Sequence, residues 1–493
     1  MMVAKDFIVA IEFGSSKVTG IAGQKNLDGS IKVLAVVKED SSSFIRKGVV
    51  NNIDKTANCL TNIVNKLKAQ LQTDITQVYV GVGGQSIRSV KNTITKDLPS
   101  DTKVTQDVVD ELMDTNYNKV YPDQEIIDVA IHEYQVDSQQ QLDPVGMQCT
   151  HLEGNFLNIL QRTKFYKNLN DSFESAGISI AEMFLAPIAL ADSVLTEAEK
   201  RSGCALVDIG SDTTTISVYS KNILRHLAVI PLGSNNITKD IASLQMEESD
   251  AEKLKLKYAC AYTDNSDIDS SLMLTIDHDR QIESHKFIEI VESRLEEIIQ
   301  NVRYQIPSDY YDKLLGGIIL TGGGSNMKEI EKAFATHTNI EKIRIAKFVT
   351  QTIISSDASI NAKNGTMNTI LGLLAKGEQN CAGSAVDPNG EDLFGGTQQQ
   401  PASTDRPARP TSERQTGVVL TEADKKAIEE AQRLREEAQK QKEEEEARIA
   451  EEEKKRIEEE QRKQEEEERR KRKENSMWNK FKKKVIDIVS ESD

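Results

Sequence analysis

The chain has few cysteines, few aromatic residues and no long apolar run. Five cysteines are scattered over 493 residues without a CxxC pair, which indicates reduced thiols in a cytoplasm and argues against a zinc site. No segment approaches the ~18 consecutive apolar residues of a membrane-spanning helix. The apolar run near the N-terminus is too short for a secretory signal. A net charge of −17 argues against wholesale nucleic-acid binding.

The hydrophobic residues, 38% of the chain, are unevenly distributed and divide the sequence into parts. Residues 1–377 have the pattern of globular domains and are long enough for two or more of them. Residues 378–420 are rich in Gly, Gln, Ser, Thr and Pro, which cannot bury a core, so we predict a disordered linker there. Residues 421–474 form a tract of Glu, Lys and Arg.

Two segments far apart in the chain share one pattern: a buried strand, an acidic residue, one further residue, a glycine and then small hydroxyl residues. The first contains Glu12 and Gly14, and the second contains Asp208 and Gly210. Glycine lets backbone N–H groups approach an anion closely, because no Cβ intervenes. A carboxylate would hold water on Mg²⁺ instead of binding phosphate. The repeat predicts two related lobes that close on one nucleotide, and two ordinary hairpin turns are the alternative.

A third glycine turn follows an apolar strand and precedes a predicted helix. Its three consecutive glycines, Gly322, Gly323 and Gly324, would let the backbone pass close to a flat ligand or a phosphate. A flexible turn is the alternative. The position in a third strand–glycine–helix unit favours a ligand site.

Hydrophobic periodicity predicts an α/β organisation for the globular part. Strands are expected at 7–11, 18–22, 32–37, 77–82, 126–134 and 148–151, and helices at 55–71, 105–117, 164–176, 186–199, 236–244, 248–258 and 284–304. Residues 86–162 lack phosphate-loop chemistry, and we predict that they are an inserted α+β module with a loop at 139–141.

The charged tract is predicted to be a solvated single helix. Many of its pairs place Glu four residues before Lys or Arg, an orientation worth about 0.2–0.5 kcal/mol per pair in an isolated helix. A coiled coil is the alternative, but apolar residues such as Ile428, Leu434 and Ile449 do not form a sustained a/d seam.

Residues 476–490 are predicted to form an amphipathic helix that binds a membrane surface. Aromatic and aliphatic side chains share one arc of a helical wheel, and lysines lie opposite or at its edge. The residues assigned to the membrane are Met477, Trp478, Phe481, Lys482, Lys483, Lys484, Val485, Ile488 and Val489. Docking onto the protein's own core or a partner groove is the alternative, and the long polar spacer favours the membrane.

These features together resemble the actin/heat-shock-70/hexokinase ATPase superfamily, in which two phosphate loops and an adenosine loop occur in this order. Within that superfamily the chain is similar to the FtsA family of bacterial cell-division proteins. The similarity covers about residues 5–377 and the terminal helix. The segments that carry it are Arg46–Asp54, Val194–Lys200, Ile230–Ala242, Asp250–Tyr258 and Asn368–Leu374.

The resemblance implies an actin-like, two-lobed α/β fold built from four subdomains. Subdomain 1A would comprise residues 1–85, 163–200 and 350–377. The inserted, SHS2-like subdomain 1C would comprise residues 86–162. Subdomain 2A would comprise residues 201–234 and 306–349, and subdomain 2B residues 235–305.

The resemblance also implies ATP and Mg²⁺ in the cleft between the lobes. The residues assigned to the nucleotide are Gly14, Ser15, Ser16, Lys17, Gly210, Ser211, Thr213, Gly233, Glu283, Lys286, Gly322, Gly323, Gly324 and Asn326. Glu12 and Asp208 would hold magnesium through water. The implied partners are further copies in filaments, the C-terminal peptide of the tubulin-like protein FtsZ on 2B, an anionic membrane surface, and later division proteins through 1C. The implied place is the inner face of the cytoplasmic membrane at the division site.

Departures from the family pattern bear on catalysis. Glu12 stands where Asp is usual, and Ser234 and Ala259 each replace a glycine. The segment 186–190 offers no acid or amide side chain, so Asp208 is the candidate general base. We therefore predict at most a weak ATPase, in which the nucleotide tunes assembly.

Three other functions use related folds, because a fold does not determine a function. A pilus-assembly actin homologue has a similar insertion but lacks the tethered terminal helix. A small-molecule kinase would need a carboxylate base beside a substrate pocket and has no use for that helix. A chaperone of the heat-shock-70 type would need a β-rich domain after residue 377, where this chain has a charged tract instead.

Overall fold

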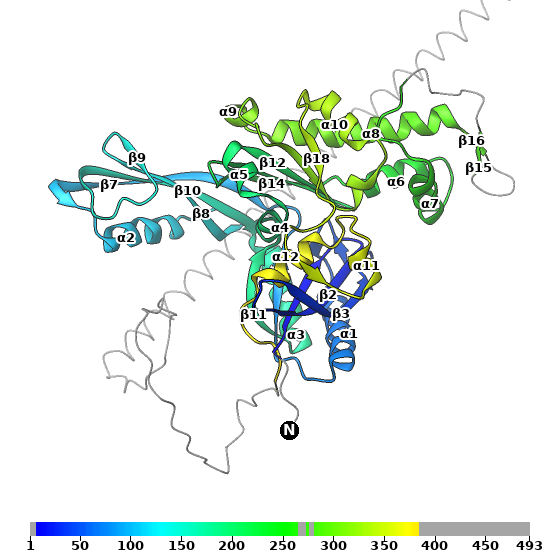
Figure 1. The fold of residues 1–493 in the computed structure, drawn as a ribbon, viewed down its shortest axis with the longest axis horizontal. Coiled ribbons are helices and arrows are strands. Elements are labelled where there is room, and N and C mark those ends of the chain that lie inside the picture. The colour runs from blue at the N-terminus through cyan, green and yellow to red at the C-terminus, as the bar shows by residue number, and fades with distance from the viewer. Residues whose placement is uncertain (1–5, 265–272, 276–280, 384–493) are drawn as a thin grey trace, which may run out of the picture. The chain divides into compact units, whose positions relative to one another are not determined.

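The structure of the protein, a computed structural model, describes residues 6–264, 273–275 and 281–383 (Figure 1). The charged tract, the terminal helix and nearly all of the expected linker lie outside the described residues. The first residues of that linker differ from the prediction. Cys381 is fully buried, and its backbone N–H donates to the carbonyl of Phe7 at 2.8 Å. The globular part therefore continues to at least residue 383.

The first lobe is built on a six-stranded sheet with the order β11-β6-β1-β2-β3-β19. Its central strand, β1, pairs parallel with β6 and antiparallel with β2, and Val9, Ala10 and Ile11 are fully buried. The strands predicted at 7–11, 18–22, 32–37 and 77–82 are confirmed. The bounds are β1 Ile8–Phe13, β2 Lys17–Lys25, β3 Ile31–Asp40, β6 Gln77–Val82, β11 Ser179–Leu185 and β19 Ile353–Ile354, and a small hairpin joins β4 Ile45–Arg46 to β5 Val49–Val50.

The helices of this lobe pack in two pairs, α1 with α3 and α4 with α12 (Figure 1). In α1 the Asn52 side chain accepts the backbone N–H of Lys55 at 2.9 Å, which caps the first turn. Apolar residues at helical spacing, including Leu60, Ile63 and Leu67, are fully buried. The bounds are α1 Ile53–Leu71, α3 Thr163–Ala176, α4 Ala186–Val194, α11 Ala358–Asn361 and α12 Asn368–Lys376.

The second lobe repeats this arrangement at the start of a nine-stranded sheet with the order β18-β17-β12-β13-β14-β7-β10-β8-β9. Strand β12 pairs parallel with β17 and antiparallel with β13, as β1 does with β6 and β2. Ala205 and Val207 of β12 are fully buried. The bounds are β12 Cys204–Ile209, β13 Thr214–Ser220, β14 Ile223–Ile230, β17 Gly317–Thr321 and β18 Ile343–Ile345.

The remaining elements of the second lobe are mostly helical. Helix α6 packs against both α7 and α8, and α8 also packs against α10. The bounds are α5 Glu197–Ser202, α6 Ser234–Ala242, α7 Glu248–Tyr258, α8 Ser284–Gln305, α9 Ser308–Tyr311, the 3₁₀ helix η2 Gly323–Asn326, α10 Ile330–Thr338, and the paired strands β15 Met273–Thr275 and β16 Gln281–Glu283. No helix within the described ranges is long and apolar enough to span a membrane.

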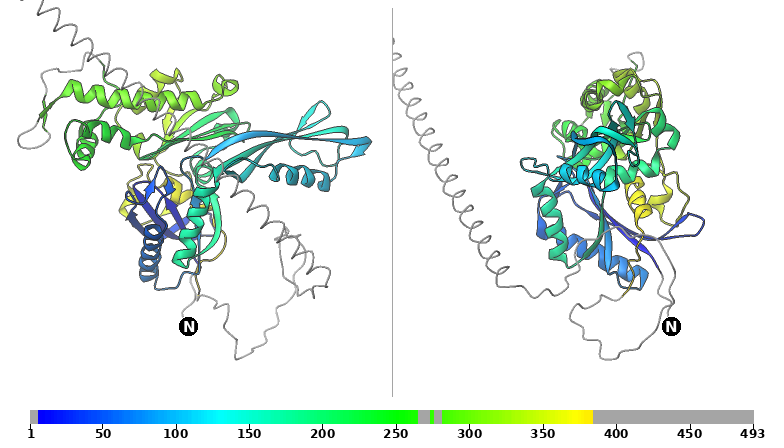
Figure 2. Two further views of the ribbon diagram at one scale, coloured as in Figure 1. Left: turned by 180° about the vertical axis from the view of Figure 1, so that it is seen from behind. Right: turned by 90° about the vertical axis from the view of Figure 1, so that its left-hand side faces the viewer.

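An α+β module is inserted between β6 and α3, as predicted, and has its own small core around Leu112, Leu152 and Phe156. Its sheet is continuous with that of the second lobe, because β7 lies beside β14 with Arg88 opposite Ala228 (Figure 2). The bounds are β7 Arg88–Lys103, α2 Gln106–Tyr117, β8 Gln124–Val136, β9 Gln139–Gln141 and β10 Gln148–Arg162. The module is therefore joined to one lobe by the chain and to the other by a sheet.

Two predictions of secondary structure are wrong. Residues 139–141, predicted as a loop, form strand β9, which pairs with the end of β8. The helix predicted at 186–199 is divided into α4 and α5. Leu195 is extended (φ −90°, ψ 139°), and Thr196 and Glu199 form a capping box that begins α5.

An ion pair closes the contact between the module and the second lobe. The Arg225 guanidinium on β14 lies 2.9 Å from the Glu133 carboxylate on β8, and the two side chains are 7% and 18% exposed. Removing one partner would leave the other charge buried and unpaired. We define the module–lobe seam as Ser89, Glu133, Arg225 and Leu227.

We predict that Glu133→Ala lowers the free energy of unfolding by about 2 kcal/mol, because it leaves Arg225 without its partner. Chemical denaturation followed by circular dichroism measures the change. The control is Asp97→Ala, which removes a side-chain contact with His151 on the module at a carboxylate that is 89% exposed. The control should change stability by no more than about 0.5 kcal/mol. Equal losses in the two variants would contradict the prediction.

Candidate functional site

The two predicted phosphate loops have the same local geometry. The N–H of Gly14 donates to the carbonyl of Lys17 at 3.0 Å, and the N–H of Gly210 donates to the carbonyl of Thr213 at 2.9 Å. A Cβ at Gly14 would lie 2.8 Å from the Lys17 oxygen, and one at Gly210 would lie 2.9 Å from the Thr213 oxygen. Each turn therefore needs a glycine.

The residues before these turns are also equivalent. Glu12 lies opposite Thr19 across the first hairpin, and Asp208 lies opposite Thr215 across the second. The sequence left open that these segments are two ordinary hairpin turns, and their local backbone is indeed that of hairpins. The two turns nevertheless line the same cavity, which has a volume of about 1430 Å³.

The third glycine turn lines the same cavity. Gly322 has φ +83°, and a Cβ there would lie 2.3 Å from the Asp208 carboxylate. A Cβ at Gly324 would meet the Ile209 side chain at 2.3 Å. The turn thus packs directly on the second phosphate loop. Thirteen of the predicted site residues line the cavity: Glu12, Gly14, Ser15, Ser16, Lys17, Asp208, Gly210, Ser211, Thr213, Gly322, Gly323, Gly324 and Asn326.

Gly233 is not among the lining residues and supports the second loop from behind. A Cβ at Gly233 would lie 2.4 Å from the Ser211 carbonyl oxygen. Helix α6 begins at the next residue, and its first N–H groups, of Ser234 and Asn235, donate to the carbonyls of Gly210 and Ser211 at 2.9 and 2.7 Å. Gly233 therefore packs against the second loop and does not itself line the cavity.

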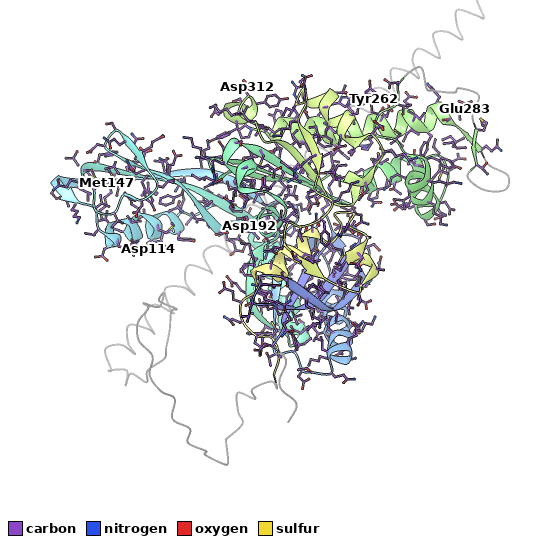
Figure 3. All side chains as sticks on the ribbon, in the orientation of Figure 1. Asp114, Met147, Asp192, Tyr262, Glu283 and Asp312 are labelled. Carbon is purple, nitrogen blue, oxygen red and sulfur yellow. The ribbon has the colours of Figure 1, made fainter. Side chains whose placement is uncertain are left out.

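Glu283 and Lys286 are not brought to this cavity. Glu283 ends β16 and Lys286 lies in the first turn of α8, and Figure 3 shows Glu283 at the outer end of the second lobe. Their assignment to the nucleotide has no support in the geometry. The family resemblance alone suggested them, and the cavity wall on this side includes residues of α7, the helix before α8.

That wall is formed by α6 and α7. The Lys255 ammonium contacts the Glu252 carboxylate and the Thr238 hydroxyl, each at 2.7 Å, and the Ser234 carbonyl at 3.1 Å. All four of these residues line the cavity. The sequence segment Asp250–Tyr258 contains two of them and carried the family resemblance, so this signal was available and was not used for the site.

The floor of the cavity holds two carboxyl groups. Burial, and next the nearby Asp208 carboxylate, raise the pKa of Glu12 to about 7, while Lys17 and Lys38 lower it. Burial raises the pKa of Asp208 to about 6. Within the described ranges, no group of three or more His, Cys, Asp or Glu side chains is arranged to hold a metal ion directly. The two carboxylates could instead act through metal-bound water.

The fold defines an actin-like protein, in which three glycine turns line one cavity between the lobes. A solved structure described as a PilM-PilN type IV pilus biogenesis complex has this fold, with a TM-score of 0.52 and 13% identity over 76% of this chain and 98% of that one. At this identity the likeness shows the fold alone.

Two family models match the chain: "Cell division protein FtsA" over residues 205–363, and "SHS2 domain inserted in FTSA" over residues 84–160. The cell division protein FtsA of Porphyromonas gingivalis is 30% identical over 381 residues, which covers 75% of this chain and 78% of that protein. The FtsA of Neisseria meningitidis is 32% identical over 332 residues, covering 66% and 80%. The chain belongs to the FtsA family of cell-division proteins.

We predict that the stability of the magnesium-free protein depends on pH through Glu12. Its pKa is about 7 in the folded chain against an ordinary value of 4.5, so the folded state keeps a proton that the unfolded state releases between these values. The free energy of unfolding should therefore fall as pH rises from about 4.5 to 7. Glu12→Gln, which is neutral at every pH, should be about 2 kcal/mol more stable than the parent at pH 8 and similar to it near pH 4.5.

Thermal unfolding in EDTA at the two pH values measures this difference. Glu182→Gln, at an exposed carboxylate on β11, is the control and should follow the parent protein. A Glu12→Gln protein with the pH dependence of its parent would show that Glu12 does not hold the proton.

Proposed function

We propose that this protein is an ATP-binding, actin-like cell-division protein that assembles on the inner face of the cytoplasmic membrane and tethers the FtsZ ring there. The single observation that carries the nucleotide site is the pair of equivalent glycine turns on one cavity. Membership of the FtsA family supports the role in division. In the proposed organisation, the first lobe is 1A, the inserted module is 1C, and the second lobe divides into 2A and 2B.

The cavity offers a suitable environment for each part of ATP. Backbone N–H groups beside Gly14 and Gly210 would take the phosphates, because a Cβ at either glycine would crowd the turn. Glu252 and Lys255 would bind the ribose, and the Gly322–Gly324 turn would let the base lie flat against the backbone. The cavity is somewhat larger than most small-molecule sites, which leaves room for metal and water.

Magnesium fits the donors at the floor of the cavity. Glu12 and Asp208 are oxygen donors of the kind that Mg²⁺ prefers, and they are close enough for Asp208 to raise the pKa of Glu12. When bound, the ion would neutralise phosphate charge. These two carboxylates would accept hydrogen bonds from its water molecules. Because Glu12 is one methylene longer than the Asp that is usual in the family, its carboxylate would lie further from the backbone than an Asp carboxylate would.

Hydrolysis would depend on Asp208. Ala186, Pro187 and Leu190 line the cavity but carry no group that can accept a proton. Asp208 has a pKa of about 6, so it is largely ionised at neutral pH and could accept a proton from water. Asp208 would be the proton acceptor, and the residues of α4 that line the cavity offer no second polar group to orient the water. We therefore propose that ATP is hydrolysed slowly and that the bound nucleotide controls assembly.

Membrane attachment is assigned to residues 476–490, which lie outside the described residues. The apolar arc with Trp478 and Phe481 would enter the headgroup region, and each lysine near an anionic surface would contribute about 1 kcal/mol. Single helices would bind reversibly, and an assembled array would bind more firmly through avidity. The FtsZ C-terminal peptide is assigned to 2B and later division proteins to 1C.

We predict that Gly210→Val weakens binding of ATP·Mg²⁺ by more than about tenfold, because the new side chain would crowd the Thr213 carbonyl and distort the loop. Isothermal titration with a non-hydrolysable ATP analogue measures the affinity. Thr95→Val is the control, since it places the same side chain at an exposed position on β7 outside the cavity. Unchanged affinity in Gly210→Val would show that the phosphate site is elsewhere.

We predict that Trp478→Glu or Phe481→Glu detaches the protein from vesicles of anionic lipid while ATP binding persists. A carboxylate on the apolar arc cannot enter the headgroup region without a large desolvation cost. Flotation with liposomes measures attachment. Asn479→Glu, which places the same charge on the opposite side of the helical wheel, should remain bound. Co-flotation of the Trp478→Glu protein at the level of the parent would refute the anchor.

A further inference from the structure

A turn of three residues, Arg46 to Gly48, lies between the two phosphate loops. The backbone N–H of Gly48 donates to the Ser15 hydroxyl of the first loop at 2.8 Å. The backbone N–H of Lys47 donates to the Asp212 carboxylate of the second loop at 3.4 Å. Asp212 also accepts the Asn235 side-chain amide at 3.2 Å. The turn and Asp212 line the cavity, so one short segment contacts both loops beside the proposed phosphate site.

The same turn is attached to the start of the inserted module. The carbonyl of Lys47 accepts the backbone N–H of Gln85 at 2.8 Å. A Cβ at Gly48 would lie 2.6 Å from the Gly84 Cα, and one at Gly84 would lie 2.4 Å from the Gly48 oxygen. Lys47 itself has φ +51°, an uncommon conformation for a residue with a side chain. The turn is therefore held in one shape by close contact with residues 84–85.

Residues 85–89 then connect the turn to the second lobe. The Ser86 hydroxyl accepts the N–H of Arg162, so the entering and leaving strands of the module are joined at its base. The carbonyl of Ile87 accepts the N–H of Val229 at 3.2 Å, and the Ser89 hydroxyl accepts the N–H of Leu227 at 2.8 Å. The chain of contacts runs from the phosphate loops through the turn to the module–lobe seam.

We propose that the Arg46–Gly48 turn is a positioning element that couples nucleotide binding to the inserted module. Lys47 and Asp212 are its positioning residues, since they hold the turn between the loops. A ligand that restricts the motion of the two phosphate loops also restricts the turn that contacts them. Through the hydrogen bond between Lys47 and Gln85, it then restricts the base of the module. Because coupling is reciprocal, whatever fixes or loosens the module changes nucleotide affinity by the same factor. The identity of the ligand as ATP·Mg²⁺ rests on the proposed function.

The coupling has a physical basis in the two attachments of the module. It leaves and rejoins the chain in the first lobe, yet its sheet continues that of the second lobe. Any rotation of one lobe against the other must therefore act on residues 84–89, which join the two. These are the residues that contact the turn. A module fixed at its seam keeps the turn, and hence both loops, in the geometry that binds phosphate.

The test is hydrogen–deuterium exchange on the full chain without nucleotide, in the parent, in Ser89→Ala and in Thr95→Ala. Ser89→Ala removes the acceptor of the Leu227 N–H at the seam, and Thr95 is an exposed residue further along the same strand. Exchange in Ser89→Ala should rise by about threefold or more at residues 224–230 and also at residues 44–50. Thr95→Ala should leave residues 44–50 unchanged. Glu133→Ala serves as a second seam variant.

Faster exchange at the seam without a change at residues 44–50 would overturn the coupling. So would unchanged exchange at residues 224–230 in both seam variants, because the seam would then not be the link. Thermal unfolding confirms that each variant is folded. This comparison needs no ligand, so its outcome does not depend on the proposed function.

A second measurement adds ATP·Mg²⁺ to the parent protein. Protection is expected at the phosphate loops, at residues 44–50 and at residues 85–90, and Ser89→Ala should bind the nucleotide about fivefold more weakly. Protection confined to the phosphate loops would overturn the coupling. No protection at either phosphate loop would refute the proposed ATP site instead, and the ligand-free comparison would still decide whether the turn and the module are linked.

Discussion

The structure depends on the burial of one central strand in each lobe. Strands β1 and β12 each have a parallel neighbour on one side and an antiparallel hairpin partner on the other. Their central apolar residues are fully buried, so each strand has one register in which it can pack. That register sets where each strand ends. It therefore places Glu12 and Asp208, and the glycine turns that follow them, on one cavity.

Contacts outside the walls of the cavity also bear on the structure around it. The inserted module shares a sheet with the second lobe, and a buried ion pair between Arg225 and Glu133 closes the contact. The module's base is also in hydrogen-bond contact with the turn between the phosphate loops. The hydrogen bond from Gln85 to Lys47 therefore connects the base of the module to a turn that lines the cavity.

The prediction of elements succeeded where apolar periodicity was strong and failed where it was not. The helices at 55–71 and 284–304 and four strands of the first sheet were found, because their buried faces repeat at the correct period. The long strand β7 was not predicted, since Asn92 and Lys96 interrupt the apolar face on which Ile94 and Leu98 lie. Glu283 and Lys286 were assigned by resemblance to the family, and they are not among the residues that line the cavity, because a resemblance along the chain does not show which helix faces it.

By itself, the sequence determined the three glycine turns, the acidic residue before each phosphate loop and the division into an α/β part and a polar C-terminal part. These follow from local chemistry: only glycine allows such turns, and apolar spacing defines strands and helices. The tertiary structure alone decided that Glu252 and Lys255 line the cavity, that Gly233 supports a loop from behind, and that the module's sheet joins the second lobe. These depend on contacts between segments far apart in the chain, and no local pattern specifies such contacts.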